Sequence, residues 1–117
     1  MKGILAPEVQ DIVRGTIEGP DPGAIWVCTD GMPEWVKKYA SSDDPYAVTV
    51  IYSIWFEPEH YTWRNLFHEI KHCEQFYRYK QDFIDVYTQQ VIRSGYNYSD
   101  FEKEAEKYAD KMMERIE

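Results

Sequence analysis

Apolar and polar residues are arranged differently in the two halves of the chain. Apolar and β-branched residues are dense over 24–28, which predicts a short strand, and over 47–56, which predicts one long strand or two short ones. Short helices are expected over 7–14 and 33–40, with loops rich in Gly, Pro, Ser and Asp between the segments. The first half is therefore expected to form a small sheet with little helix.

From about residue 61 the apolar residues recur at spacings of three and four, which is the period of a helix. The predicted helix runs to about residue 79 and carries one apolar stripe: Trp63, Leu66, Phe67, Ile70, Cys73 and Tyr77. A further helix is expected over 82–93, and a last one begins near Ser99 and runs to the C-terminus. The pattern predicts one α+β domain over 1–117, a small twisted β-sheet with the 61–79 helix beneath it and the last helix alongside.

Composition and charge exclude several classes of partner. The chain has 21 acidic and 13 basic residues, so we expect neither nucleic acid nor an anionic membrane surface as a partner. No apolar run approaches the ~20 residues that span a bilayer, and Pro7 interrupts the N-terminal segment too early for a secretory signal. Cys28 and Cys73 form neither a CxxC pair nor a disulfide framework. A reduced, cytoplasmic protein is expected.

The segment His68-Glu69-Ile70-Lys71-His72 has the HExxH arrangement. Histidines four residues apart project from one helix face, so both imidazoles can reach one Zn²⁺ at about 2.0–2.1 Å. Glu69 lies about 100° round the helix, where its carboxylate can act as general base on a zinc-bound water. Both histidines are expected opposite the apolar stripe, facing a cleft. Because HExxH also occurs by chance in unrelated proteins, the motif alone does not establish a metal site.

Two histidines hold zinc weakly, so a third protein ligand is expected downstream, and the last helix offers one. Glu102 falls on the inward edge of its apolar stripe with Glu106 one turn later, whereas Glu104 is expected to face solvent. A buried carboxylate is costly unless it is paired, and a metal is a strong partner. The alternative role of Glu102 is local, because with Ser99 it has the spacing of a capping box.

Together, the HExxH segment and the segment 102–109 resemble the zincin superfamily, and within it the gluzincins. In that family HExxH supplies two zinc ligands and a glutamate on a later helix the third, and 102–109 is similar to the ExEAxxxA pattern of small bacterial and phage members. The resemblance implies a zinc metallopeptidase that acts on a peptide or protein substrate. It implies three ligands that hold the zinc: His68, His72 and Glu102. It implies Glu69 as the catalytic base, and a strand within 47–56 along which the substrate lies extended.

Three alternatives stay open on the sequence alone. Related peptidases place an Asp one turn after the ligand, and this chain offers that pattern twice, ending in Glu106 and in Asp110. Glu102 is preferred as the ligand and Glu106 as the residue that supports a ligand histidine, and the reverse assignment stays open. The protein is alternatively a non-catalytic zinc-binding domain that acts as a binding or regulatory module. With no metal at all, the second half is an ordinary helical hairpin.

Four other residues could belong to a metal site or have an ordinary structural role. Tyr96 and Tyr98, which precede the last helix, are placed either to stabilise an oxyanion beside the zinc or to pack. Cys73 lies on the apolar stripe and is expected to be a buried thiol. His60 has no partner histidine at ligand spacing and is expected to be a loop residue.

Overall fold

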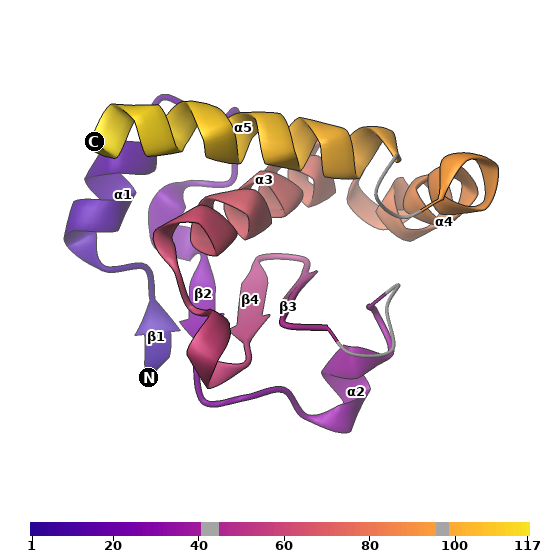
Figure 1. The fold of residues 1–117 in the computed structure, drawn as a ribbon, viewed down its shortest axis with the longest axis horizontal. Helices are drawn as coiled ribbons and strands as arrows, with labels where there is room; N and C mark the ends of the chain where they lie inside the picture. The colour runs from indigo at the N-terminus through magenta and orange to yellow at the C-terminus, as the bar shows by residue number, and fades with distance from the viewer. Residues whose placement is uncertain (41–44, 96–98) are drawn as a thin grey trace.

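The computed structural model describes residues 1–40, 45–95 and 99–117. Its strands and helices follow in the order coloured in Figure 1: β1 (Lys2–Ile4), α1 (Pro7–Val13), β2 (Trp26–Cys28), α2 (Glu34–Lys37), β3 (Ala47–Val50), β4 (Ser53–Phe56), α3 (Trp63–Tyr79), α4 (Phe83–Ser94) and α5 (Asp100–Ile116). Three 3₁₀ turns lie between them: η1 (Pro22–Ala24), η2 (Pro58–His60) and η3 (Lys80–Asp82). The predicted α+β class is confirmed. Tyr96 and Tyr98 lie outside the described residues.

The four strands form one mixed sheet in the order β1-β2-β4-β3. β2 and β4 run parallel, while β1 pairs with β2 and β3 with β4 in antiparallel register. The segment predicted over 47–56 is the β3–β4 hairpin, which turns through Ile51 at a φ of 59°. The sequence pattern does not predict β1, because its three residues include Lys2 and Gly3, and it forms by pairing with β2.

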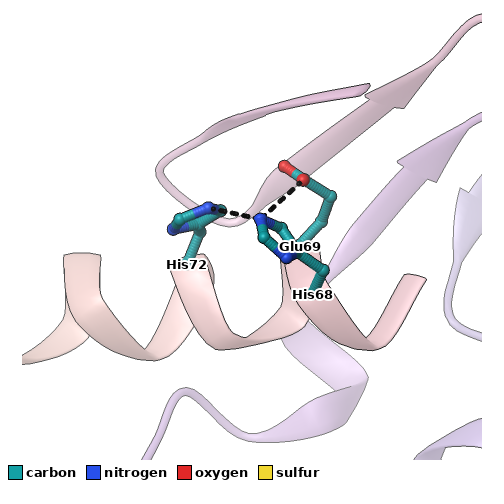
Figure 2. Close-up of side chains that lie close together, drawn as sticks. All are labelled: His68, Glu69 and His72. Carbon is teal, nitrogen blue, oxygen red and sulfur yellow. Dashed lines mark hydrogen bonds and ion pairs between the residues drawn. The ribbon is translucent and has the colours of Figure 1, made fainter. Parts of the chain in front are cut away.

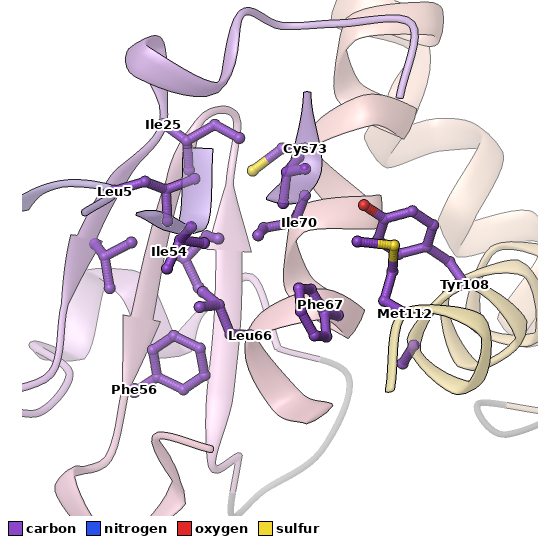
Figure 3. Close-up of a cluster of buried hydrophobic side chains, with 14 residues drawn as sticks. Leu5, Ile25, Ile54, Phe56, Leu66, Phe67, Ile70, Cys73, Tyr108 and Met112 are labelled. Atoms are coloured by element: carbon purple, nitrogen blue, oxygen red, sulfur yellow. The ribbon is translucent and has the colours of Figure 1, made fainter. Parts of the chain in front are cut away.

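The core lies on both sides of α3, which is placed between the sheet and α5 (Figure 1). Figure 3 shows sheet side chains against one flank of α3 and side chains of α5 against another. The largest cluster of buried apolar residues spans all three layers: Leu5, Val9, Val13, Ile25, Val27, Ile54, Phe56, Leu66, Phe67, Ile70, Cys73, Tyr108, Ala109 and Met112. This packing holds α3 and α5 side by side, which brings their polar edges together as well.

Local interactions set the ends of α3, and its neighbours decide which side chains are buried. The Thr62 hydroxyl accepts from the backbone N–H of Asn65 at 3.2 Å and caps the first turn. The predicted apolar stripe is wrong at both ends, because Trp63 is 44% and Tyr77 42% exposed. Both lie in end turns of the helix. None of the helices in the described ranges has the length and apolar character needed to cross a membrane.

Candidate metal centre

The two histidines of the HExxH segment lie one turn apart on α3 and bring their rings together (Figure 2). Their Nε2 atoms are 3.2 Å apart, and the ring planes meet at 76°. One ligand atom from each of His68, Glu69 and His72 lies within 4.8 Å of the others. The predicted meeting of the two rings on one helix face is therefore confirmed.

The outer ring nitrogen of His68 is held by the last helix. Nδ1 of His68 lies 2.7 Å from Oε1 of Glu106, and because a carboxylate accepts, Nδ1 carries the proton. Arg64 fixes Glu106 in turn, donating from Nη2 to Oε2 at 2.8 Å, and the same nitrogen pairs with Asp110 at 2.6 Å. These contacts orient the ring so that Nε2 faces His72 and Glu102.

The outer ring nitrogen of His72 is held by a neutral amide. Nδ1 of His72 lies 2.7 Å from Oε1 of Gln75, one turn later on α3. The amide nitrogen of Gln75 donates to the backbone oxygen of Phe101 at 3.0 Å and to Oε1 of Glu104 at 3.1 Å. These two acceptors fix which end of the amide faces His72, so Nδ1 donates to the amide oxygen and Nε2 faces His68 and Glu102.

Glu102 brings a carboxylate to both Nε2 atoms. Its Oε1 is 2.9 Å from Nε2 of His68, and its Oε2 is 3.2 Å from Nε2 of His72. The Tyr87 hydroxyl on α4 donates to Oε2. The Ser99 hydroxyl accepts from the backbone N–H of Glu102 at 3.3 Å and caps α5. The predicted cap is therefore present, while the carboxylate of Glu102 meets the histidines.

Glu69 lies beside this cluster and is held by the edge strand. The Thr49 hydroxyl on β3 lies 2.8 Å from Oε1 of Glu69 and 3.2 Å from its backbone oxygen. Oε2 of Glu69 is 3.9 Å from Nε2 of His68, whereas Glu102 approaches the same nitrogen to 2.9 Å. One oxygen is thus fixed by the sheet, and the other is within reach of a small group placed at the histidines.

Protons in this cluster are shared between the histidines and Glu102. Burial opposes protonation of His72, but the charge and hydrogen bond of Glu102, the charge of Glu69 and the hydrogen bond to Gln75 together outweigh burial and raise the pKa of His72 to about 9. The pKa of His68 is raised against burial in the same way, by its hydrogen bond to Glu102. Burial also opposes the charge of Glu102, yet His72 and the hydrogen bond from His68 hold its pKa well below the usual range. The two histidines and the Glu102 carboxylate therefore form a buried ionic cluster.

The chemistry and spacing of these donors fit a zinc ion. The ligand atoms of tetrahedral zinc, with bonds of about 2.0–2.1 Å, are separated by about 3.3 Å. The two Nε2 atoms are 3.2 Å apart, and the Glu102 carboxylate lies 2.9 Å from Nε2 of His68 through Oε1 and 3.2 Å from Nε2 of His72 through Oε2. Two neutral imidazoles and one carboxylate form a donor set that zinc takes at sites with a fourth position open to water.

A pocket with a volume of about 110 Å³ opens beside the cluster. Its polar residues include all four members of the predicted site: His68, Glu69, His72 and Glu102. On one side it is lined by the edge strand β3 and by Tyr46, which precedes that strand. On the other side it is lined by apolar and aromatic side chains of α3 and α4. The predicted cleft next to the histidines is therefore present. One of its walls is a strand edge, and the other is formed by apolar and aromatic side chains.

Sequence reasoning missed the residues that hold the predicted site in place. Gln75 had a local signal, because it follows His72 by three residues on the same helix. Thr49 had a weaker one, as the polar residue between Val48 and Val50 in a predicted strand. Tyr87 had no signal, because its contact with the cluster depends on how α4 packs.

Three other predictions are settled by burial and contacts. Glu104 was expected to face solvent, which is wrong, because its carboxylate accepts from Gln75 and lies 3.7 Å from Arg78. Both partners are long side chains of α3 that reach across to α5. Cys73 is buried as predicted, and burial raises the pKa of its thiol. His60 is not in an irregular loop but ends η2, with its ring 5.0 Å from that of Tyr46.

No family model matches this chain, and neither a curated protein nor a solved structure matches it. The likeness to gluzincins rests on the residues of the HExxH segment and of 102–109. The fold and site define an α+β protein with a four-stranded mixed sheet and a His-Glu-His group on its central helix.

Proposed function

We propose that this protein is a zincin-like zinc metallopeptidase that hydrolyses peptide bonds. The observation that carries the proposal is the meeting of two Nε2 atoms and the Glu102 carboxylate within 2.9–3.2 Å, with Glu69 beside them. His68, His72 and Glu102 are the proposed ligands. Their outer atoms are already held by Glu106, Gln75 and Tyr87, as metal ligands require.

The proposed mechanism divides the work between the metal and this chain. Zinc bound at the three ligands would supply a Lewis acid that polarises the scissile carbonyl and lowers the pKa of water to about 7. Glu69 takes one proton from the attacking water, whose oxygen bonds to the carbonyl carbon. The carbon–nitrogen bond breaks, and Glu69 returns the proton to the leaving nitrogen. Thr49 holds Oε1 of Glu69, which leaves Oε2 for these transfers.

The edge strand β3 supports a peptide as the substrate. Tyr46 accepts from the backbone N–H of Glu57 at 3.0 Å, so these residues form a hydrogen-bonded pair in the hairpin. Pairs alternate in an antiparallel ladder, which turns the backbone groups of Ala47 and Thr49 away from β4. Both residues line the pocket beside the histidines. An extended peptide that pairs with them would pass next to Glu69.

The position of Glu69 favours catalysis over a purely structural zinc site. A structural site fills all four positions with protein, and Glu69 would be the nearest candidate for the fourth. Its Oε1 is instead engaged by Thr49, and its Oε2 is 3.9 Å from Nε2 of His68. A pocket also opens at this point, which gives a substrate access that a structural site does not need.

Replacing Glu69 tests the proposal. In zinc-loaded protein, Glu69→Gln should lower hydrolysis of a quenched-fluorescent peptide library by at least about a hundredfold, because the general base is lost. Zinc content, measured by elemental analysis, should stay at that of the wild type. Absence of hydrolysis by zinc-loaded wild-type protein would contradict the proposal. Loss of zinc from folded Glu69→Gln would contradict the role given to Glu69.

A further inference from the structure

We propose that Phe76, Phe83, Ile84 and Tyr87 form a recognition pocket for one large apolar side chain of the substrate, next to the bond that is cut. This inference rests on the proposed function, and it names the class of peptide that the site takes. All four residues line the pocket that also holds His68, Glu69, His72 and Glu102. A side chain seated among them lies beside the residues proposed to cut the peptide.

The aromatic part of this wall is held rigidly in place. The rings of Phe76 and Phe83 stack with centroids 3.8 Å apart, and the Phe83 ring stacks on Phe101 of α5 at 5.1 Å. Tyr87 continues the stack, 5.7 Å from Phe83, and its hydroxyl is fixed by Glu102. These rings therefore link the core directly to the metal cluster. Their positions are set before any ligand arrives, so binding does not require ordering them.

The charges around the pocket select against polar substrate side chains. The charged residues that line it, within the described part of the chain, are members of the cluster itself. No Lys or Arg lines the pocket there, so an acidic substrate side chain would leave water for the aromatic wall with neither residue type to pair with it. A basic side chain would have to leave water for a wall of aromatic and aliphatic groups. An uncharged, apolar side chain has neither penalty and removes apolar surface from water on both partners.

Ile84 makes the recognition wall testable without disturbing the fold. It is 40% exposed and lies outside the buried apolar clusters, so its side chain is not needed for core packing. Ile92 lies on the same helix two turns later, is 80% exposed and does not line the pocket. The two isoleucines are therefore a matched pair that differs in access to the pocket.

The experiment measures peptide binding to zinc-loaded Glu69→Gln protein by fluorescence anisotropy, so that binding is read without turnover. The probes are labelled hexapeptides of Gly and Ser that differ at one central position: Leu, Phe, Gly, Asp or Lys. The Leu and Phe peptides should bind about ten- to a hundredfold more tightly than the Gly peptide, from burial of one large apolar side chain. Ile84→Lys, added to this background, should remove most of that preference, whereas Ile92→Lys should leave it unchanged.

The outcomes separate this inference from the proposed function. Equal binding of all five peptides, or equal loss of preference in the Ile84→Lys and Ile92→Lys proteins, would overturn the recognition pocket. If wild-type protein cuts the peptide library without preference for Leu or Phe, the recognition pocket fails and the peptidase stands. If the preference is found in binding while wild-type protein cuts nothing, the pocket stands and the peptidase fails.

Discussion

At the scale of single residues, the third candidate ligand shows how position on a helix face decides a chemical role. Glu102 and Glu106 lie one turn apart on α5, and both contact His68, but at different atoms. Glu102 reaches Nε2, the nitrogen that faces His72, whereas Glu106 reaches Nδ1 on the outer edge of the ring. The proposed ligand and the residue proposed to support a ligand are thus separated by one helical turn.

Zinc titration of charge-removing variants tests this assignment. Glu102→Gln should lose most of the zinc affinity, because the amide is a poor ligand for zinc. Glu106→Gln should lose about ten- to a hundredfold, as expected when a residue that orients a ligand is changed. The measurement is competition with a chelator of known affinity. Glu114→Gln, on the exposed side of the same helix, is the control and should bind zinc like the wild type. Wild-type zinc affinity in Glu102→Gln, together with loss of zinc affinity in Glu106→Gln, would show that Glu106 is the ligand and Glu102 is not.

At the scale of elements, other segments of the molecule pack against α3. They contact it through polar as well as apolar side chains. Glu74, almost completely buried on α3, receives an ion pair from Lys71 within the helix. It also accepts from the backbone N–H of Glu18 at 2.6 Å, which ties the loop after α1 to the helix. Lys71 in turn lies over the ring of Tyr108 of α5, 5.1 Å from its centre. One buried carboxylate therefore connects three segments.

Removing this carboxylate should destabilise the protein strongly. Glu74→Ala leaves the largely buried Lys71 without its partner, and breaking such a pair from one side costs roughly 3–5 kcal/mol in the free energy of unfolding. Urea unfolding followed by tryptophan fluorescence measures the change. Glu34→Ala removes an exposed partner of Lys37 and should leave the midpoint unchanged. A loss below about 1 kcal/mol in Glu74→Ala would show that Lys71 finds water or another partner.

At the scale of the whole molecule, the metal cluster joins the two long helices that enclose most of the core. His68 and His72 belong to α3 and Glu102 to α5, so a metal bound by them would cross-link the two helices, with His68 and Glu102 34 residues apart. Without metal, the same groups are joined by the ion pair between the histidines and Glu102. A zinc ion at the proposed site would compete with protons for the same nitrogen atoms, so stability should depend on pH in opposite ways with and without zinc.

In the metal-free protein, the direction in which stability changes with pH follows from the shifted pKa values. The pKa of His72 rises from 6.5 to about 9 on folding, so in chelator its stabilising effect is complete below about pH 6.5 and is lost toward pH 9. A loss on the order of 2–3 kcal/mol in the free energy of unfolding is expected over that range. The lowered pKa of Glu102 adds the opposite limit, because its contribution is lost as the pH falls below about 4.5.

Zinc should reverse this trend. Its ligands must be unprotonated, so the increase in stability on adding buffered free zinc should grow between pH 6 and pH 8.5. Urea unfolding with chelator and with zinc, at three pH values in this range, measures both trends. His72→Gln should flatten both of them, since it removes the titrating ring. Parallel curves with and without zinc would contradict a metal bound at the histidine nitrogens.

Sequence alone determined the features of this protein that depend on short spacings. Helical and strand periods located the five helices and three of the four strands seen in the described residues, because these patterns repeat within a few residues. The facing pair His68 and His72 follows from a separation of four on one helix. The cap formed by Ser99 follows from its place at the start of the last helix.

Only the tertiary structure decided how these pieces meet. It selected Glu102 over Glu106 beside the two Nε2 atoms, and it brought Thr49 to Glu69 and Tyr87 to Glu102. It also buried Glu74 and left Trp63 exposed, against the simplest reading of their polarity. These contacts join residues 15 to 34 positions apart, or depend on which neighbour covers a helix end. Their geometry is set by how the layers pack, and the chemistry of any one segment does not contain that information.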